Sequence, residues 1–202
     1  YCILGKGVKI QVALVVPPQL VTPSGGRRWL EEYTPPPRSK QVQKRLRLTL
    51  LDAVLAVCRA ARDCATTGLI GHGEGAVVCQ AALSDECRTA AYRERHVAEA
   101  ERLELESVVT SLTHVVLLAP HVHPLRSYLP LLREYVPEIV SVLPGEDTQV
   151  LTVIPSQDPA SAVSLQIAHG IHECATETVR FPGPAYRSMP ASPLALYQLM
   201  PA

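Results

Sequence analysis

The sequence predicts a three-layer α/β domain with a mostly parallel sheet of about five or six strands. The first reason is that short, β-rich apolar runs alternate along the chain with longer segments of helical spacing. This alternation is typical of a parallel sheet covered by helices on both faces. The second reason is size, because 202 residues with 47% hydrophobic and 19% charged residues suit one globular domain. We therefore treat residues 1–202 as a single domain.

The first half of the chain carries the clearest patterns. The run from Val8 to Val16 is rich in β-forming residues and ends at Pro17-Pro18, which predicts a buried strand. The amphipathic spacing from Lys44 to Arg62 predicts a helix. Further expected elements are a basic, proline-rich loop over 22–43, a short strand at 69–70, a helix of small apolar residues over 76–83 and a charge-dense helical region over 85–106.

The second half repeats the alternation in shorter segments. Buried strands are expected at 115–119, 150–154 and 178–181, each followed directly by proline. Helical stretches are expected at 125–135 and 160–172, and residues 190–202 are expected to form a tail or a short last helix.

Overall composition excludes several classes of function. The formal net charge is zero, so no global field attracts nucleic acid or an anionic membrane, and no apolar run is long enough to span a membrane. The six cysteines contain no CxxC pair, which indicates buried free thiols and a reducing intracellular compartment, the cytoplasm or the mitochondrial matrix. The chain begins at Tyr1 without Met, which suggests a processed product or a fragment.

The most informative motif is Gly71-His72-Gly73-Glu74-Gly75, between an expected strand and an expected helix. A strand, a sharp G-x-S-x-G turn and a helix form the nucleophile elbow of α/β-hydrolases, in which crowding requires the flanking glycines. Gly73 stands where the serine is expected, so the turn offers no nucleophile and accepts positive φ without strain. His72 is expected to pack against the end of the sheet.

Two other interpretations of this glycine-rich turn are open. It could be a chance turn between a strand and a helix. It could also cradle a phosphate at a helix N-terminus, but it lacks the G-K-[ST] ending of a P-loop and does not match G-x-G-x-x-G. Glu74 would moreover place a carboxylate where the phosphate must lie.

With this motif and the order of elements, the chain resembles the FSH family of serine hydrolases, which are small α/β-hydrolases. The resemblance covers most of residues 8–190, through 12–17, the glycine and tryptophan loop 25–29, the elbow, 113–120 and 149–158. Only the elbow is a specific motif. The resemblance implies an α/β-hydrolase-like domain.

The resemblance also implies that the catalytic apparatus is lost. Asp158 lies at the position of the family's acid, but Ser156-Gln157-Asp158-Pro159 is equally explained as a turn and helix start. The histidine should follow the last strand, where this chain has Ala185 and no histidine. The loop that supplies the oxyanion donor has no room before residue 8, so the sheet is expected to be trimmed on its N-terminal side. We therefore expect no enzyme activity and no cofactor.

Other chemistry-bearing residues give weaker signals. His121 and His123 follow an expected strand end, and His169, His172 and Cys174 are close in sequence. Neither set has a complete ligand shell, so we expect exposed histidines and no metal. Cys79 lies too deep in its helix to replace the nucleophile.

A local basic stretch over 27–47 could contact RNA phosphates or an acidic protein surface. The alternative is a solvated loop and helix start. Its basic residues are Arg27, Arg28, Arg38, Lys40, Lys44, Arg45 and Arg47.

These observations favour a catalytically inactive hydrolase-like protein that serves as a structural or accessory subunit of a larger protein or ribonucleoprotein assembly. One alternative is a hydrolase of small acyl esters with a non-standard site, for example Asp158 with His121 or His123 and a bound water. Another is a small-ligand binding module that uses the vestigial cleft.

Overall fold

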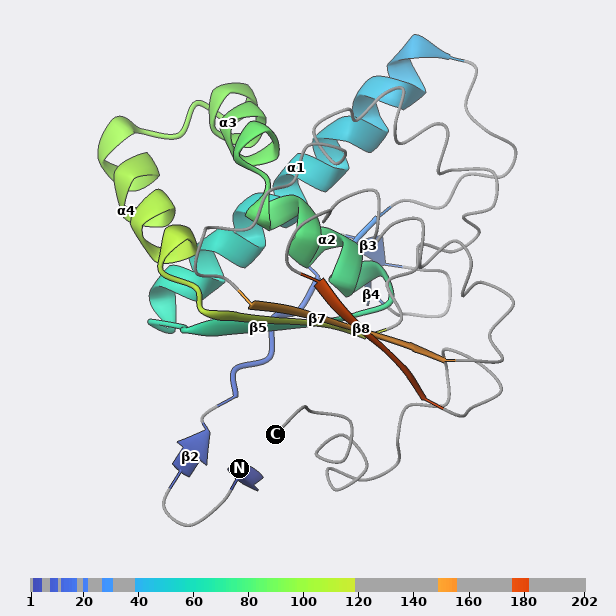
Figure 1. The fold of residues 1–202 in the computed structure, drawn as a ribbon. Coiled ribbons are helices and arrows are strands. Elements are labelled where there is room, and N and C mark those ends of the chain that lie inside the picture. The colour runs from blue at the N-terminus through green and yellow to red at the C-terminus, as the bar shows by residue number, and fades with distance from the viewer. Residues whose placement is uncertain are drawn as a thin grey trace.

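The computed structural model describes residues 2–4, 8–10, 12–17, 20–21, 27–30, 39–118, 149–155 and 176–181. These residues form a layer of helices on a small parallel sheet, with two short antiparallel strand pairs besides (Figure 1). The helices are α1 (Lys40–Asp63), α2 (Glu74–Leu83), α3 (Asp85–Glu94) and α4 (Glu99–Thr110). The strands are β1 (Cys2–Leu4), β2 (Val8–Ile10), β3 (Leu20–Val21), β4 (Arg27–Arg28), β5 (Gly68–His72), β6 (His114–Leu118), β7 (Gln149–Pro155) and β8 (Thr176–Phe181).

The main sheet contains β5, β6, β7 and β8 in that spatial order, and all neighbouring strands are parallel. Gly68 pairs with His114, and His114 pairs with Gln149, so the starts of three strands are aligned. Strands that follow one another in the chain are thus neighbours in the sheet, as short connections favour. Among the described strands, β5 has a neighbour on one side only.

All four described helices lie on one face of this sheet (Figure 1). The core is formed where α1 and α2 pack together over β5 and β6. α1 contributes its apolar stripe, which recurs every three or four residues, as expected of an amphipathic helix. Its members include Leu50, Leu51, Val54 and Cys58, all of them buried. Since the described helices cover only one face, the full three-layer α/β class stays a prediction.

The charge-dense region 85–106 is helical, as expected, but it forms two helices. α3 ends near Arg95, and His96 takes a positive φ of 50° before α4 begins at Glu99. Positive φ interrupts the helical hydrogen-bond ladder, and the chain turns there. Ser84 caps α3, with its Oγ accepting a hydrogen bond from the backbone N–H of Cys87.

The prediction of a buried strand from Val8 to Val16 is wrong. The strand ends at Ile10, and it pairs with β1 in a hairpin instead of joining the main sheet. Beyond it, the side chains of Val12, Leu14 and Val16 are 69%, 89% and 51% exposed. Alternating apolar residues favour an extended backbone, but burial needs a partner strand and a packed face, which the sequence pattern alone does not supply.

The remaining expectations divide between described and undescribed residues. β6, β7 and β8 occur where strands were expected, and the expected loop 22–43 includes the two-residue strand β4 and the start of α1. The expected helices at 125–135 and 160–172 and the tail 190–202 lie outside the described residues. No helix among those described is long and apolar enough to cross a membrane.

Cys58, Cys64, Cys79 and Cys87 are free thiols, and all of these except the exposed Cys64 are buried. Burial raises the pKa of Cys58 to about 12 and that of Cys79 to about 12. These thiols therefore stay protonated at neutral pH and behave as apolar core groups.

Candidate functional site

The turn between β5 and α2 is the candidate site. Gly73 lies at its apex with φ 57° and ψ −121°, and it is the single glycine with positive φ among the described residues. Its N–H donates to the carbonyl of Leu118 at the end of β6, with an N···O distance of 3.0 Å. Its carbonyl accepts from the N–H of Ala76 at 3.1 Å and so starts α2. Hydrogen bonds on both sides thus hold residue 73 in a conformation that other residues adopt only with strain.

Crowding makes glycine necessary at position 71. A Cβ on Gly71 would lie 2.5 Å from the Cα of Ala76 and 2.7 Å from its nitrogen. Both are backbone atoms of the first turn of α2, so neither can move without displacing the helix. The expected requirement for glycine two residues before the apex therefore holds.

Among the described residues, no backbone atom crowds Gly75 in this way, so the requirement for glycine at that position stays a prediction. A Cβ there would meet the indole of Trp29 first, at 3.4 Å from Nε1. This is an ordinary van der Waals distance to a side chain. The asymmetry arises because Gly71 faces the helix backbone, whereas Gly75 faces a side chain from a distant segment.

Glu74 connects the elbow to the segment 27–30, which we call the strap. Its Oε1 forms an ion pair with Nη2 of Arg28 at 2.9 Å, and its Oε2 accepts from the backbone N–H of Trp29 at 3.3 Å. Both charged side chains are largely buried. The Glu74 carboxylate, whose charge disfavours phosphate binding at this turn, thus binds the strap instead.

His72 is exposed, contrary to the expectation that it packs against the sheet end. Side chains alternate along a strand, and Gly71 faces α2. His72 and Ile70 therefore point to the opposite face, on which no described helix lies (Figure 1). The Ile70 side chain is 66% exposed on that face.

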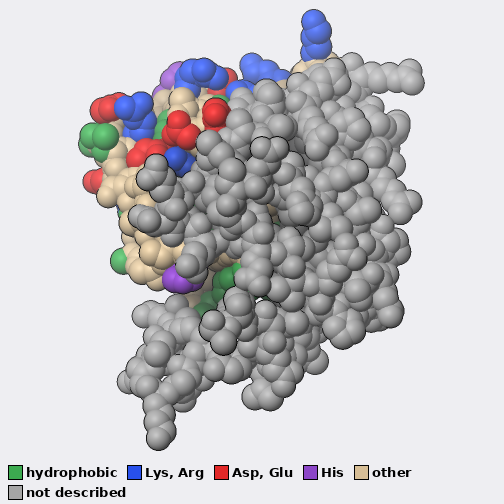
Figure 2. Space-filling view, in the orientation of Figure 1, with side chains coloured by type: hydrophobic (Ala, Val, Ile, Leu, Met, Phe, Trp, Pro, Cys, Tyr) green, Lys and Arg blue, Asp and Glu red, His purple; other side chains and the backbone are tan. Residues whose placement is uncertain are grey.

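Two of the basic residues of 27–47 form ion pairs with carboxylates of the chain itself. Arg28 pairs with Glu74 at the elbow, and Arg47 pairs with Glu94 of α3 at 3.2 Å. Lys40 and Lys44 lie exposed in the first turns of α1. Figure 2 shows basic and acidic side chains interspersed over the described part of this face. The expected contact with an anionic partner stays a prediction, and Arg38 lies outside the described residues.

Several other candidates cannot be placed. Asp158 and Ala185, the expected positions of the acid and the histidine, lie outside the described residues, as do His121, His123, His169, His172 and Cys174. Within the described segments, no group of three His, Cys, Asp or Glu side chains could hold a metal ion.

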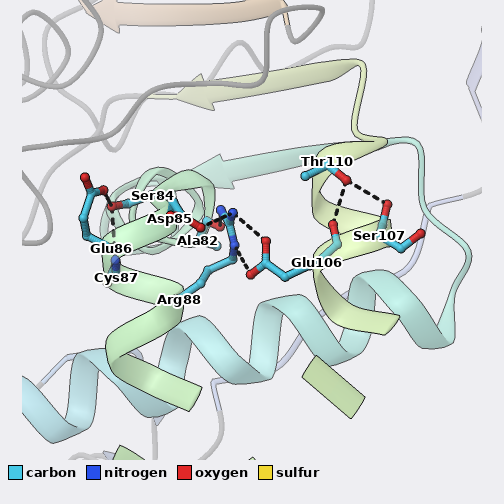
Figure 3. A network of polar contacts seen from close by, with 9 residues as sticks. All are labelled: Ala82, Ser84, Asp85, Glu86, Cys87, Arg88, Glu106, Ser107 and Thr110. Carbon is cyan, nitrogen blue, oxygen red and sulfur yellow. Dashed lines mark hydrogen bonds and ion pairs between the residues drawn. The ribbon is translucent and has the colours of Figure 1, made fainter. Parts of the chain in front are cut away.

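The sequence reasoning missed a buried ion pair in the helical layer (Figure 3). Arg88 of α3 binds Glu106 of α4 through two hydrogen bonds, of 2.8 Å and 2.9 Å, and its Nη1 donates to the carbonyl of Ala82 at 3.0 Å. The Arg88 side chain is 5% exposed and that of Glu106 27%. One guanidinium thus joins α3 to α4 and satisfies a carbonyl at the end of α2.

The charges of this pair shift both pKa values. Burial alone raises the pKa of Glu106, but the hydrogen bonds and charge of Arg88 outweigh it and lower that pKa below its usual value. Burial alone lowers the pKa of Arg88, and Glu106 raises it above its usual value. Nearby, burial also raises the pKa of the Tyr92 hydroxyl, and the negative charge of Glu106 adds to that rise. This cluster is a structural element of the core, away from the elbow.

Comparisons of the chain with protein-family models, with curated proteins and with solved structures found no match. The resemblance to the FSH serine hydrolases therefore remains a prediction that depends on the elbow. The geometry of residues 68–76 supports the strand–turn–helix part of that resemblance. The assignment of Asp158 to the acid position and of Ala185 to the position of the missing histidine stays a prediction.

Proposed function

We propose that this chain is a catalytically inactive hydrolase-like protein that serves as a structural or accessory subunit of a larger assembly. One observation carries the proposal. The residue at the sharp bend between β5 and α2 is Gly73, which has positive φ and no side chain. A hydrolase elbow presents a hydroxyl or thiol at that position. Without it, nucleophilic acyl transfer has no attacking atom, and losing the nucleophile of a triad forfeits most of the rate.

The neighbouring groups do not replace the nucleophile. Cys79 follows six residues later in α2, where it is buried and where burial raises its pKa to about 12. A thiol of that pKa holds a negligible fraction of reactive thiolate at neutral pH. Glu74 would also oppose the negative charge that builds up on the oxygen during acyl transfer, because that charge needs hydrogen-bond donors beside the elbow.

Exposed apolar side chains near the sheet support a role in an assembly. Ile70 lies on β5, which has a neighbour on one side only among the described strands, and Val12, Leu14 and Val16 are also more than half exposed. An unpaired strand edge with apolar side chains is a common site of association. A protein partner is favoured over RNA, because Arg28 and Arg47 are paired with carboxylates of the chain itself.

The test is the native mass of the protein in a cell extract, for the wild type and two matched variants. Ile70→Lys places a charge at the sheet edge, and Leu103→Lys places the same charge on α4 at a side chain that is 60% exposed. We expect the wild type and Leu103→Lys in a large particle and Ile70→Lys shifted toward the monomer. A wild-type protein that is strictly monomeric would contradict the proposal. Loss of the particle after ribonuclease treatment would show that RNA, not protein, is the partner.

A further inference from the structure

We infer that Glu74 acts as a latch that holds the strap, residues 27–30, against the elbow, and that the strap opens when the latch is broken. The inference does not depend on the proposed function. It concerns how the chain closes its own strand–turn–helix site. Its basis is that the residue directly after Gly73 sends its side chain to a segment 46 positions earlier in the sequence.

The latch has two parts that act on adjacent residues of the strap. One carboxylate oxygen binds the Arg28 guanidinium at 2.9 Å, and the other accepts the backbone N–H of Trp29 at 3.3 Å. Hydrogen bonds to a charged group are about twice as strong as neutral ones. The carboxylate binds both the Arg28 side chain and the Trp29 backbone. It therefore holds the strap in position and also neutralises the charge of Arg28.

The indole of Trp29 is the part of the strap that lies on the elbow. A Cβ added to Gly75 would lie 3.4 Å from the indole Nε1. The ring therefore lies against the start of α2. Trp29 also packs on the edge of the core, and the next residue, Leu30, is buried within it. The strap is therefore anchored at Leu30 and closed by Trp29.

Two further contacts of the strap with described residues are individually weak. Arg28 and Arg27 pair with Leu20 and Val21 in a ladder only two residues long. Arg27 is exposed and donates to the carbonyl of Pro17 at 3.5 Å. A two-residue pair of strands is not stable by itself, so we expect the contacts with Glu74 to supply much of the polar stabilisation of the closed strap. This makes the closed state sensitive to a single side chain.

Trp29 is the only tryptophan of the chain, so its fluorescence reports the strap directly. We would measure the emission maximum and the quenching by acrylamide, under native conditions, for Glu74→Ala, Glu74→Gln and Arg28→Ala. The matched control is Arg47→Ala, which removes the ion pair between Arg47 of α1 and Glu94 of α3. That pair does not involve the strap. Helix content by circular dichroism shows whether each variant is folded.

For Glu74→Ala we expect emission at longer wavelength and roughly a tenfold rise in the open fraction, as expected when charge-assisted hydrogen bonds are lost. Arg28→Ala and Glu74→Gln each leave one part of the latch and should give smaller shifts of the same sign. Arg47→Ala should leave the emission unchanged.

Unchanged emission and quenching in folded Arg28→Ala and Glu74→Gln would overturn the inference, whether or not Glu74→Ala folds. Such a result would mean that indole packing alone holds the strap. An equal shift in Arg47→Ala would also overturn it, because the response would then be general loosening. None of these outcomes bears on whether the elbow is inert, which a covalent probe tests separately.

Discussion

The helical layer and the elbow are held together by opposite means. In the helical layer, side chains supply the stability, through apolar packing and the Arg88–Glu106 pair between α3 and α4. At the elbow, the absence of side chains is decisive, because Gly71 has no room for a Cβ and Gly73 has a positive φ. The helical layer therefore depends on favourable contacts between its side chains. The elbow depends on glycines whose replacement by a larger residue would cause steric clashes or backbone strain. Substitutions should separate the two.

The largest expected effect is in the helical layer. Glu106→Ala leaves the Arg88 guanidinium buried without its carboxylate, which costs about 3 to 5 kcal/mol of unfolding free energy for a buried pair. Denaturant unfolding measures the loss. The control is Glu104→Ala on the same helix, whose side chain is 64% exposed and which should change little. A loss below about 1 kcal/mol for Glu106→Ala would show that the pair is effectively solvated.

The same pair should make stability depend on pH. The folded-state pKa of Glu106 is lowered, so the carboxylate contributes stability above its unfolded-state pKa, which is about 4.3. That contribution is lost as pH falls through the lower folded-state pKa. The difference in unfolding free energy between the wild type and Glu106→Gln should therefore be constant near neutral pH and shrink below about pH 4. A constant difference at all pH values would disprove this role of the charge.

At the elbow, Gly71→Ala should cost about 3 kcal/mol, because its Cβ overlaps backbone atoms that cannot rotate away. Thermal and denaturant unfolding give the size of the loss. A variant as stable as the wild type would mean that α2 moves freely relative to β5, which would contradict the geometry of the turn.

Gly73→Ser should cost less, about 1 to 3 kcal/mol, which is the usual strain of an ordinary residue in this backbone region. It also restores a hydroxyl at the apex. Because we expect the histidine to be missing, the variant should remain unable to hydrolyse acyl esters. Ester hydrolysis by the folded variant would indicate that an imidazole lies beside the elbow.

The smallest effect is expected at Gly75, and its comparison with Gly71 contrasts the two glycines that flank the apex of the elbow. Gly75→Ala adds a Cβ at ordinary contact distance from Trp29 and replaces a glycine inside α2. Alanine is the better helix former by about 1 kcal/mol, so unfolding free energy should stay equal or rise by up to that amount. A loss of unfolding free energy as large as that of Gly71→Ala would show that Trp29 cannot move to accommodate the added Cβ.

Local patterns predicted those parts of the molecule that depend on neighbouring residues. The spacing of apolar residues predicted α1. The short apolar run, the glycine-rich turn and the small apolar residues after it predicted β5, the turn and α2. The same kind of reasoning failed at Val12, Leu14 and Val16, since alternation does not reveal whether a partner strand exists. It also could not foresee that Trp29, which is distant in sequence, lies against Gly75.

The two ion pairs that matter most could not be found from local patterns. Arg88 and Glu106 are 18 positions apart on different helices, and Arg28 and Glu74 are 46 apart. Arg28, Arg88 and Glu106 lie in stretches rich in charge, where solvated side chains are the usual outcome. The only usable signal was Glu74 itself, a carboxylate beside a turn that was otherwise built of small residues.

The most direct test of the central claim is covalent labelling of the purified protein with a fluorophosphonate, followed by intact-mass measurement, together with assays on a panel of short acyl esters. Because residue 73 presents no attacking atom, we predict an unmodified mass and no hydrolysis above the buffer rate. A stoichiometric adduct, or ester turnover that disappears on unfolding, would contradict the account.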